Sequence, residues 1–305
     1  MDGNIGFIGL GAMGEPMAAR IAAAGFRLTV HDADAARTQR IAAAIGAGAA
    51  RTPAEAAAAS DILVTMLPSS AVVETVLDGP DGALAGLASG SIVVEMSSGV
   101  PDTTRLLAGR AAERGIALID APVSGGVARA KTGELAIMAG GDAAAIDRAQ
   151  PLLEAMGSSV IRTGVIGSAH AMKALNNLVS AGGFLIGIEA LLIGQKFGLD
   201  PALMVDVLNV STGMNNSTQK KFKQYVLSRR FDAGFGLDLM VKDLGIALGV
   251  AEATSTPAPF AGLCKDIWAG AQKVLGPGQD HTAVAKFSEL VAGATLGGGD
   301  EGGRS

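Results

Sequence analysis

The chain has 305 residues, of which 49% are hydrophobic and 17% are charged, and its formal net charge is −5. This length predicts two domains, and the hydrophobic content excludes a disordered chain. The negative charge argues against nucleic acid as the main partner, because phosphate binding needs a dense basic surface, and a single cysteine, Cys264, excludes an intrachain disulfide.

The first half of the chain alternates short apolar runs with alanine-rich runs of helical periodicity. Strands are predicted at residues 5–9, 28–32, 62–67, 92–95 and 117–120, with two more at 135–138 and 160–162 that extend the sheet. Helices are predicted between them, for example at 16–24 and 35–44. Strands that are apolar throughout are typical of sheets covered on both faces, so the alternation predicts an α/β fold with a doubly wound parallel sheet.

The second half is predicted to be helical. From residue 168 to about 296 no strand pattern appears, and glycines and prolines interrupt helical periodicity. The most apolar stretch, 175–194, contains Asn176, Asn177 and Glu189, which favours a buried helix over a membrane span. We expect an α/β domain at 1–164, an all-helical domain at 165–296, and a disordered glycine-rich tail at 297–305.

The cellular location is predicted from what the N-terminus and the cysteine content indicate. The chain opens on a strand-like stretch and shows no basic segment followed by an apolar core and a cleavage site. One cysteine also fits a reducing compartment. We therefore expect a cytoplasmic protein that binds neither membrane nor nucleic acid.

A glycine motif after the first strand predicts a dinucleotide site. Gly9, Leu10, Gly11, Ala12, Met13 and Gly14 form a G-x-G-x-x-G between a predicted strand and a predicted helix. The first glycine permits the tight turn, the second lets the backbone approach the pyrophosphate, and the third lets helix and strand pack closely. The helix N-terminus presents free N–H groups to the phosphates. The alternative is a glycine-rich turn without a ligand.

Asp32 ends the second predicted strand, roughly 20 residues past the glycines, where an acid binds the adenosine ribose hydroxyls. A carboxylate there repels a 2′-phosphate, so NAD is favoured over NADP, although Arg37 nearby keeps NADP possible. The alternative for Asp32 is a helix N-cap.

Two further segments carry candidate chemistry. Residues 120–126 follow a strand at its carboxyl end, and the turn Ser124-Gly125-Gly126 offers a hydroxyl and unhindered N–H groups to a substrate carboxylate. An ordinary turn is equally compatible with this segment. Lys173 and Asn177 share a helix face, and a partly buried lysine gives up its proton readily enough to act as acid and base. By itself, a surface lysine is the commoner case.

Lys242-Asp243 lies in a second apolar helical segment, 237–251. This pair would close over the cofactor from the helical domain, and an exposed charge pair is the alternative. The three histidines and one cysteine show no metal-ligand spacing, so no metal is expected.

Four of these segments, in this order, resemble the β-hydroxyacid dehydrogenase family. They are residues 6–14, residues 120–126 with the following Gly133 and Gly140-Gly141, residues 173–177, and residues 242–244. The resemblance implies that 1–164 is an NAD(P)-binding Rossmann domain. It also implies that the helical domain at 165–296, joined to it by a long helix that starts near Ser168, serves substrate binding and dimerisation. It also implies an NAD(P)-dependent oxidoreductase of the 3-hydroxyisobutyrate dehydrogenase type, assembled as a homodimer or homotetramer.

The resemblance implies a role for each matching residue. Lys173 would be the catalytic acid/base, and Ser124, Gly125, Gly126 and Asn177 would bind a small hydroxy acid or semialdehyde. The residues that it implies line the cofactor, beside the glycine motif and Asp32, are Leu67, Pro68, Val72, Ser98 and Lys242.

Several alternatives stay open at this stage. A reductase of tartronate, glyoxylate or succinic semialdehyde and an imine reductase share the fold, and Lys173 argues against the imine reductase. A phosphorylated-sugar-acid dehydrogenase lacks support because no basic cluster is evident, and a non-catalytic nucleotide-binding protein is the alternative from another class. The stretch 211–217 departs from familiar members and is expected to affect substrate choice.

Overall fold

The computed structural model describes residues 3–58 and 60–297, in two compact units, Met1–Lys173 and Ala174–Ser305. The sequence placed the boundary at 164/165. The structure moves it to 173/174 because the backbone N–H groups of Gly167 and His170 donate hydrogen bonds to Asp120 in the sheet. Of the tail predicted to be disordered, 298–305 lies outside the described residues, while the amide of Gly297 donates to Gln195.

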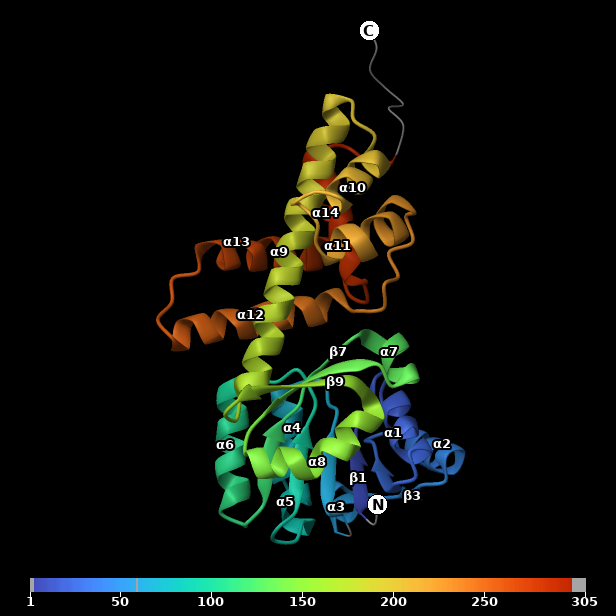
Figure 1. Cartoon of the computed structure of the whole chain (residues 1–305), viewed down its shortest axis with the longest axis vertical. Coiled ribbons are helices and arrows are strands. Elements are labelled where there is room, and N and C mark those ends of the chain that lie inside the picture. The colour runs from blue at the N-terminus through green and yellow to red at the C-terminus, as the bar shows by residue number, and fades with distance from the viewer. Residues whose placement is uncertain (1–2, 59, 298–305) are drawn as a thin grey trace. The chain divides into compact units, whose positions relative to one another are not determined.

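The first unit is built on one sheet (Figure 1). Its strands are β1 (Asn4–Ile8), β2 (Arg27–His31), β3 (Gly48–Ala49), β4 (Ile62–Thr65), β5 (Ile92–Glu95), β6 (Ala117–Asp120), β7 (Val123–Ser124), β8 (Leu135–Gly140) and β9 (Gly157–Gly164). The sheet order is β3-β2-β1-β4-β5-β6-β8-β7, with β9 also pairing with β8. All predicted strands are present, and the sequence missed only the two-residue strands β3 and β7.

The sheet is parallel from β3 to β6, as predicted, but β8 runs antiparallel to β6 and to β7. A parallel return needs a crossover of a dozen or more residues. Only the short helix α7 (Gly126–Thr132) lies between β7 and β8, so these two strands pair as antiparallel neighbours. The extension of the sheet beyond β6 is therefore mixed in direction.

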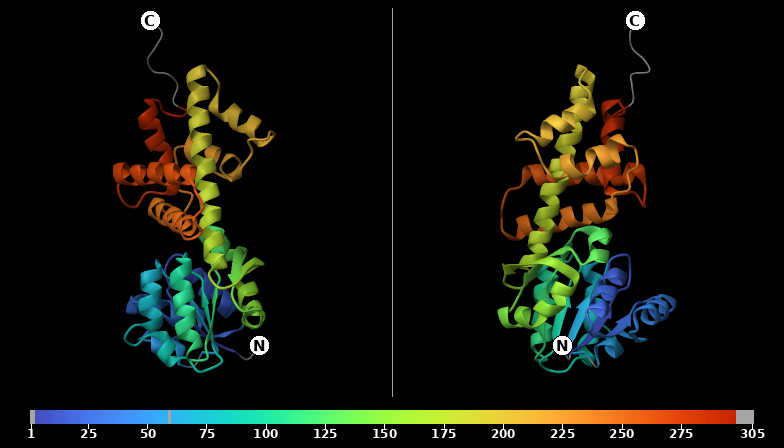
Figure 2. Two further views of the ribbon diagram at one scale, coloured as in Figure 1. Left: turned by 90° about the vertical axis from the view of Figure 1, so that its left-hand side faces the viewer. Right: turned by 45° about the vertical axis from the view of Figure 1, so that its right-hand side comes forward.

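Helices cover both faces of the sheet, as Figure 2 shows. The remaining helices of this unit are α1 (Gly14–Ala23), α2 (Ala35–Ile45), α3 (Pro53–Ala57), α4 (Ser70–Asp78), α5 (Ala83–Gly86), α6 (Pro101–Ala112) and α8 (Ala143–Met156). Consecutive side chains of β1 enter different cores: Phe7 packs in a cluster with Met17 of α1, and Ile8 in a cluster with Leu77 of α4. This explains why the strands are apolar throughout.

The second unit is helical over its described residues. Its elements are the greater part of α9 (Ser168–Phe197), then α10 (Pro201–Asn209), α11 (Asn216–Lys220), the π-helix η1 (Phe222–Leu227), α12 (Leu237–Ala253), α13 (Pro259–Leu275), the 3-10 helix η2 (His281–Ala283) and α14 (Val284–Ala292). Phe184 of α9 is central to the core and contacts the rings of Phe222 and Trp268, with centroids at 5.3 and 6.0 Å. The α/β fold with a helical second domain is thus confirmed.

The helix α9 begins at Ser168, as the resemblance predicts, and is the one candidate membrane span among the described residues by length and composition. More than half of its most apolar window, 56%, is buried inside the protein. Such a helix is weak support for a membrane span, because core helices have the same composition. Its exposed apolar side chains include Val179, Ile186 and Ile193, seven residues apart along one stripe.

Candidate active site

The predicted dinucleotide turn joins β1 to α1 and has the steric features that each glycine was expected to provide. Gly9 has φ +98°, and a Cβ atom there would lie 2.3 Å from the Met66 carbonyl oxygen. A Cβ on Gly14 would lie 1.8 Å from the Gly9 oxygen, whereas a Cβ on Gly11 would meet nothing within 4 Å. The outer glycines are therefore required by the fold, and the open space at Gly11 fits the approach of a pyrophosphate.

Asp32 directly follows β2, beside this turn. Its Oδ2 accepts a hydrogen bond from the Leu10 amide at 2.7 Å, and its Oδ1 lies 3.1 Å from Arg37 Nη1. The N-cap of α2 is Asp34, which accepts from the Arg37 amide, so the alternative that Asp32 is this cap is wrong. The Asp32 carboxylate thus lies against the glycine turn, where a ribose-binding acid is needed.

The other residues predicted to line the cofactor follow the carboxyl ends of β4 and β5. The Leu67 amide donates to the Ser97 hydroxyl at 2.8 Å, which links the two segments. Ser98 is half-buried, Pro68 is exposed, and Val72 at the start of α4 is 37% exposed. Open parallel sheets bind ligands at this edge, so these positions fit a cofactor, although their individual roles remain predictions.

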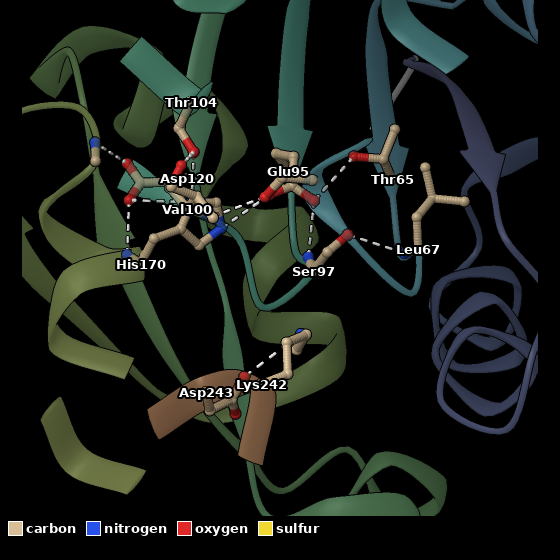
Figure 3. A network of polar contacts seen from close by, with 12 residues as sticks. Thr65, Leu67, Glu95, Ser97, Val100, Thr104, Asp120, His170, Lys242 and Asp243 are labelled. Atoms are coloured by element: carbon tan, nitrogen blue, oxygen red, sulfur yellow. Dashed lines mark hydrogen bonds and ion pairs between the residues drawn. The ribbon is translucent and has the colours of Figure 1, made fainter. Parts of the chain in front are cut away.

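A buried ionic cluster lies at the same edge of the sheet, where β5 and β6 end (Figure 3). Glu95 and Asp120 are register partners on these strands, and the ring of His170 lies between their carboxylates. His170 Nε2 is 2.8 Å from Glu95 Oε2, and Asp120 accepts hydrogen bonds from the amides of Gly167 and His170 at 2.8 and 2.9 Å. We call Glu95, Asp120, Thr104 and His170 the His170 cluster.

The hydrogen bonds of this cluster indicate a protonated histidine. The single hydroxyl hydrogen of Thr104 is donated to the Val100 carbonyl, so the Thr104 oxygen accepts from His170 Nδ1 at 2.8 Å. Glu95 Oε1 accepts from the Ser97 amide at 2.9 Å, which is typical of an ionised carboxylate. With Nδ1 donating to Thr104 and Nε2 at ion-pair distance from the Glu95 carboxylate, the ring is best described as an imidazolium.

Electrostatics support the same protonation state. Burial alone would lower the pKa of His170, but the charges of Glu95 and Asp120 outweigh burial and raise it. Burial alone would raise the pKa of Glu95, but the imidazolium and the bonds from Ser97 lower it. The cluster ties the first turn of α9 to the strand ends, and Ser97 extends the chain of bonds to Leu67.

Glycines make room for this cluster. A Cβ on Gly99 would lie 2.8 Å from His170 Cε1, and a Cβ on Gly140 would lie 2.7 Å from Asp120 Oδ1. The glycine pair Gly140-Gly141 belongs to the motifs on which the family resemblance rests. Gly140 therefore has to be a glycine for a steric reason: a larger side chain would collide with the Asp120 carboxylate.

The predicted carboxylate-binding turn and the predicted catalytic lysine both belong to the first unit. Ser124 ends β7 and is half-buried, while Gly125 and Gly126 are exposed with φ +135° and +69°. Lys173 lies on α9, one turn after His170, and is only 8% exposed. The alternative of a solvated surface lysine is therefore wrong for Lys173.

In the second unit, α9 and α12 hold a polar pair. Asn177 Nδ2 donates to Asp243 Oδ2 at 2.6 Å, and Asp243 is 1% exposed. Lys242 Nζ lies 3.4 Å from Asp243 Oδ1. Asp243 therefore orients the Asn177 amide as well as pairing with Lys242, and the alternative of an exposed charge pair is wrong because Asp243 is buried.

Sequence reasoning missed two of these arrangements. It placed Glu95 and Asp120 at strand ends, and for His170 it favoured a cap or packing role over tuning of Lys173. The pattern that could have revealed this cluster is an acid at the end of each of two apolar strands, because a carboxylate buried there needs a charged or hydrogen-bonding partner. No signal in the sequence pointed to the Asn177–Asp243 bond, which joins residues 66 positions apart. No group of three or more metal-ligating side chains gathers within residues 3–58 and 60–297.

Comparison with known proteins places the two units in one family. Residues 4–167 match the NAD binding domain of 6-phosphogluconate dehydrogenase, and residues 167–288 match the NAD-binding domain of NADP-dependent 3-hydroxyisobutyrate dehydrogenase. The chain belongs to the β-hydroxyacid dehydrogenase family. It is accordingly an NAD(P)-dependent oxidoreductase that acts on the CH–OH group of hydroxy acids.

Individual relatives align over nearly the whole chain. The chain is 38% identical to 2-(hydroxymethyl)glutarate dehydrogenase of Eubacterium barkeri, over 97% of this chain and 98% of that protein. It is 36% identical to 3-hydroxyisobutyrate dehydrogenase of Pseudomonas aeruginosa, over 87% and 91%. The structure of Mycobacterium tuberculosis 3-hydroxyisobutyrate dehydrogenase with L-serine superposes with a TM-score of 0.86, at 32% identity over 94% and 99% of the two chains.

Proposed function

We propose that this enzyme oxidises the primary alcohol of a small 3-hydroxy acid, or reduces the matching semialdehyde, with Lys173 as the acid/base. The observation that supports this most is the buried Lys173, one helical turn before Asn177, whose amide is held at 2.6 Å by Asp243. A lysine out of bulk water exchanges a proton with a bound alcohol more readily than a solvated one.

The names of the relatives narrow the substrate class. 2-(Hydroxymethyl)glutarate, 3-hydroxyisobutyrate and serine, the compounds named with these proteins, share one unit, HOCH2–CHR–COO−, and differ only in R. We therefore propose that HOCH2–CHR–COO− is the part of the substrate that reacts here. The identity of R is taken up below.

Each proposed role follows from the chemistry of the side chain. Ser124, Gly125 and Gly126 bind the substrate carboxylate through a hydroxyl and backbone N–H groups. Lys173 accepts the hydroxyl proton during oxidation and returns it during reduction, and Asn177 orients the hydroxyl. Nicotinamide, when bound, accepts or supplies the hydride. We propose NAD as the preferred cofactor, because the Asp32 carboxylate repels a 2′-phosphate and offsets the charge of Arg37. We also propose that Lys242 lies near the bound cofactor.

The test is the initial rate of absorbance change at about 340 nm, the band of reduced nicotinamide. NAD and NADP are each offered with 3-hydroxyisobutyrate, 2-(hydroxymethyl)glutarate, serine, glycerate, 4-hydroxybutyrate and the corresponding aldehydes. Lys173→Ala is expected to lower kcat by about 10²- to 10⁴-fold, which is the contribution of general acid–base catalysis. Lys131→Ala, at an exposed position on α7, is the control for a lost lysine.

Near-normal turnover by a folded Lys173→Ala enzyme would refute the acid/base role. Faster turnover of 4-hydroxybutyrate or of its aldehyde would move the substrate class to succinic semialdehyde. Turnover of cyclic imines alone would assign an imine reductase.

We also propose a cytoplasmic homodimer or homotetramer. The apolar stripe of α9, Val179, Ile186 and Ile193, is 57–76% exposed, and an exposed apolar stripe is typical of a protein interface. Light scattering after gel filtration measures the assembly, and Ile186→Glu is expected to shift it to the monomer. Recovery of the protein with membranes, without detergent release, would contradict this proposal.

A further inference from the structure

Lys221 is a half-buried cation in the second unit, and within residues 3–58 and 60–297 its side chain hydrogen-bonds to a neutral hydroxyl. Its Nζ donates to the Ser180 hydroxyl at 3.3 Å and lies 5.9 Å from the centroid of the Phe184 ring. An ammonium has three N–H donors, so one hydroxyl leaves it under-coordinated. Within the described part of the chain, no carboxylate lies within ion-pair distance of this nitrogen, although Lys223 and Lys242 each have one.

Burial without an anionic partner destabilises the charged form of this lysine. Burial lowers the pKa of Lys221 to about 8, and Asp280 opposes this only in part. The Asp280 carboxylate is already engaged by the amides of Gly234, Phe235 and Thr282. The fold therefore leaves the Lys221 charge without a dedicated counter-charge.

The partner of Lys221 lies on the helix face that carries the proposed chemistry. Asn177, Ser180 and Phe184 are three and four residues apart, so they follow one stripe of α9, and Lys173 begins the same stripe. Ser180 is about 4.5 Å further along the helix axis than Asn177, at a rise of about 1.5 Å per residue. Ser180, the next polar side chain on this stripe after Asn177, is also the hydrogen-bond partner of Lys221.

The backbone around Lys221 is fixed to α9 on both sides. Asn215 caps α11 by accepting from the amides of Ser217 and Thr218, and its Nδ2 donates to the Gly183 carbonyl of α9 at 3.4 Å. Phe222 is fully buried and packs edge-to-face on Phe184. Lys221 is the residue between α11 and the π-helix η1, and π-helical turns are frequently found at functional sites. The backbone from which the Lys221 side chain extends is thus fixed against α9.

We propose that Lys221, with Ser180, binds a second carboxylate on the R group of the substrate, so that the preferred substrates are dicarboxylic acids of the form HOCH2–CHR–COO−. This inference rests on the proposed function. It also gives a role to the segment 211–217, which departs from familiar members of the family, because Asn215 of that segment joins the start of α11 to α9. An anion at this position would supply the counter-charge that the fold does not.

The test compares substrates that differ only in R. 2-(Hydroxymethyl)glutarate carries a carboxylate there, and 2-(hydroxymethyl)pentanoate replaces that carboxylate by a methyl group. The measured quantity is the ratio of kcat/KM for the diacid to kcat/KM for the monoacid, at about pH 7. Wild-type enzyme is expected to favour the diacid, and Lys221→Gln to lower the ratio by about 10- to 100-fold, mainly through a higher KM for the diacid.

Two matched variants guard against a general loss of structure. Lys221→Arg keeps the charge and is expected to retain at least part of the preference for the diacid. Lys220→Gln removes an exposed lysine one position earlier and is expected to leave the ratio unchanged. Glutarate, which lacks the alcohol, is expected to inhibit the wild-type holoenzyme competitively and the Lys221→Gln holoenzyme far more weakly.

The outcomes separate this inference from the proposed function. If Lys173-dependent turnover is present but the wild-type ratio favours the monoacid, or Lys221→Gln leaves the ratio unchanged, the inference about Lys221 is wrong and the proposed function stands. If Lys221→Gln, Lys221→Arg and Lys220→Gln lower both kcat/KM values alike, Lys221 has a structural role only. If no hydroxy acid is turned over in a Lys173-dependent manner, the proposed function itself fails.

Discussion

His170 and Lys221 are two cations removed from bulk water, one in each unit, and the fold treats them in opposite ways. His170 lies between two buried carboxylates, 2.8 Å from Glu95, and its pKa is raised. Lys221 has a hydroxyl and an aromatic ring as neighbours, and its pKa is lowered to about 8. Burial disfavours both charges, so the presence of an anionic partner decides the direction of each shift.

This difference distinguishes a structural charge from one that is available to a ligand. A cation whose counter-charge is supplied by the fold holds elements together, as the His170 cluster holds α9 to the sheet. A cation whose counter-charge is missing lowers stability until an anion binds. Such a penalty is typical of functional positions, where activity and stability conflict.

The largest expected effect is on stability, and it tests the first half of this comparison. His170→Ala leaves Glu95 and Asp120 buried at neighbouring positions without their cation. Removing one partner of a buried ion pair typically lowers the free energy of unfolding by about 3–5 kcal/mol. Denaturant unfolding followed by circular dichroism measures this loss.

The control for His170→Ala is Asp206→Asn, which breaks an ion pair with Lys223 in which both side chains are at least 40% exposed. That change is expected to alter stability by less than about 1 kcal/mol. Equal effects of the two variants would show that the His170 cluster does not stabilise the first unit.

The next effect is on catalysis and concerns a charge in the second unit that does have partners. Asp243→Ala removes the acceptor that holds Asn177, so we expect kcat for the best hydroxy acid to fall by about 10²-fold, the typical penalty for a group misplaced by about 1 Å. Asp238→Ala, at an exposed position in the first turn of the same helix, is the control. An unchanged kcat in a folded Asp243→Ala enzyme would show that Asp243 is not needed to position Asn177 for catalysis.

The sequence predicted those features that depend on residues close together in the chain. Apolar runs, glycine spacing and helix breaks are local, and they gave the strands, the dinucleotide turn and the start of α9 near Ser168. The glycine turn was also predictable in detail, because the demands on Gly9 and Gly14 are steric and do not depend on the ligand.

The contacts that complete the site could not be predicted, because they join side chains that meet only after the helices pack. His170 follows Asp120 by 50 positions, and Asp243 follows Asn177 by 66. The role of Lys221 could not be predicted either, but for a different reason. Its distinguishing property is the lack of an anionic partner among the described residues, and a sequence shows which charges exist without showing which of them are paired.

The pH dependence of the unfolding free energy tests whether His170 and Glu95 are both charged in the folded protein. The raised pKa of His170 means that its stabilisation is complete below its ordinary value of 6.5 and is lost as the pH rises through the folded-state value. The lowered pKa of Glu95 means that its contribution is complete above 4.5 and is lost as the pH falls through the folded-state value. The cluster therefore stabilises most between these two ordinary values.

The measurement is the difference in unfolding free energy between wild type and His170→Gln across a pH series. We expect this difference to be greatest between 4.5 and 6.5 and to shrink toward alkaline pH. The groups facing His170 that enter this balance are Glu95, Asp120 and the Thr104 hydroxyl. A difference that grows with rising pH would show that His170 is neutral in the folded protein.

The smallest expected effect has the opposite sign and tests the second half of the comparison. Because the pKa of Lys221 falls from 10.5 to about 8 on folding, its charged form opposes folding below about 8, and wild-type stability recovers as the pH rises from there toward 10.5. Lys221→Met keeps the apolar stem and removes the charge, so at about pH 7 we expect a small rise in Tm, about 2–4 °C for each kcal/mol gained. This gain should disappear at about pH 10, and the exposed control Lys220→Met should show no such trend. A fall in Tm at every pH would show that the ammonium stabilises the fold, and Lys221 would then join His170 as a structural cation.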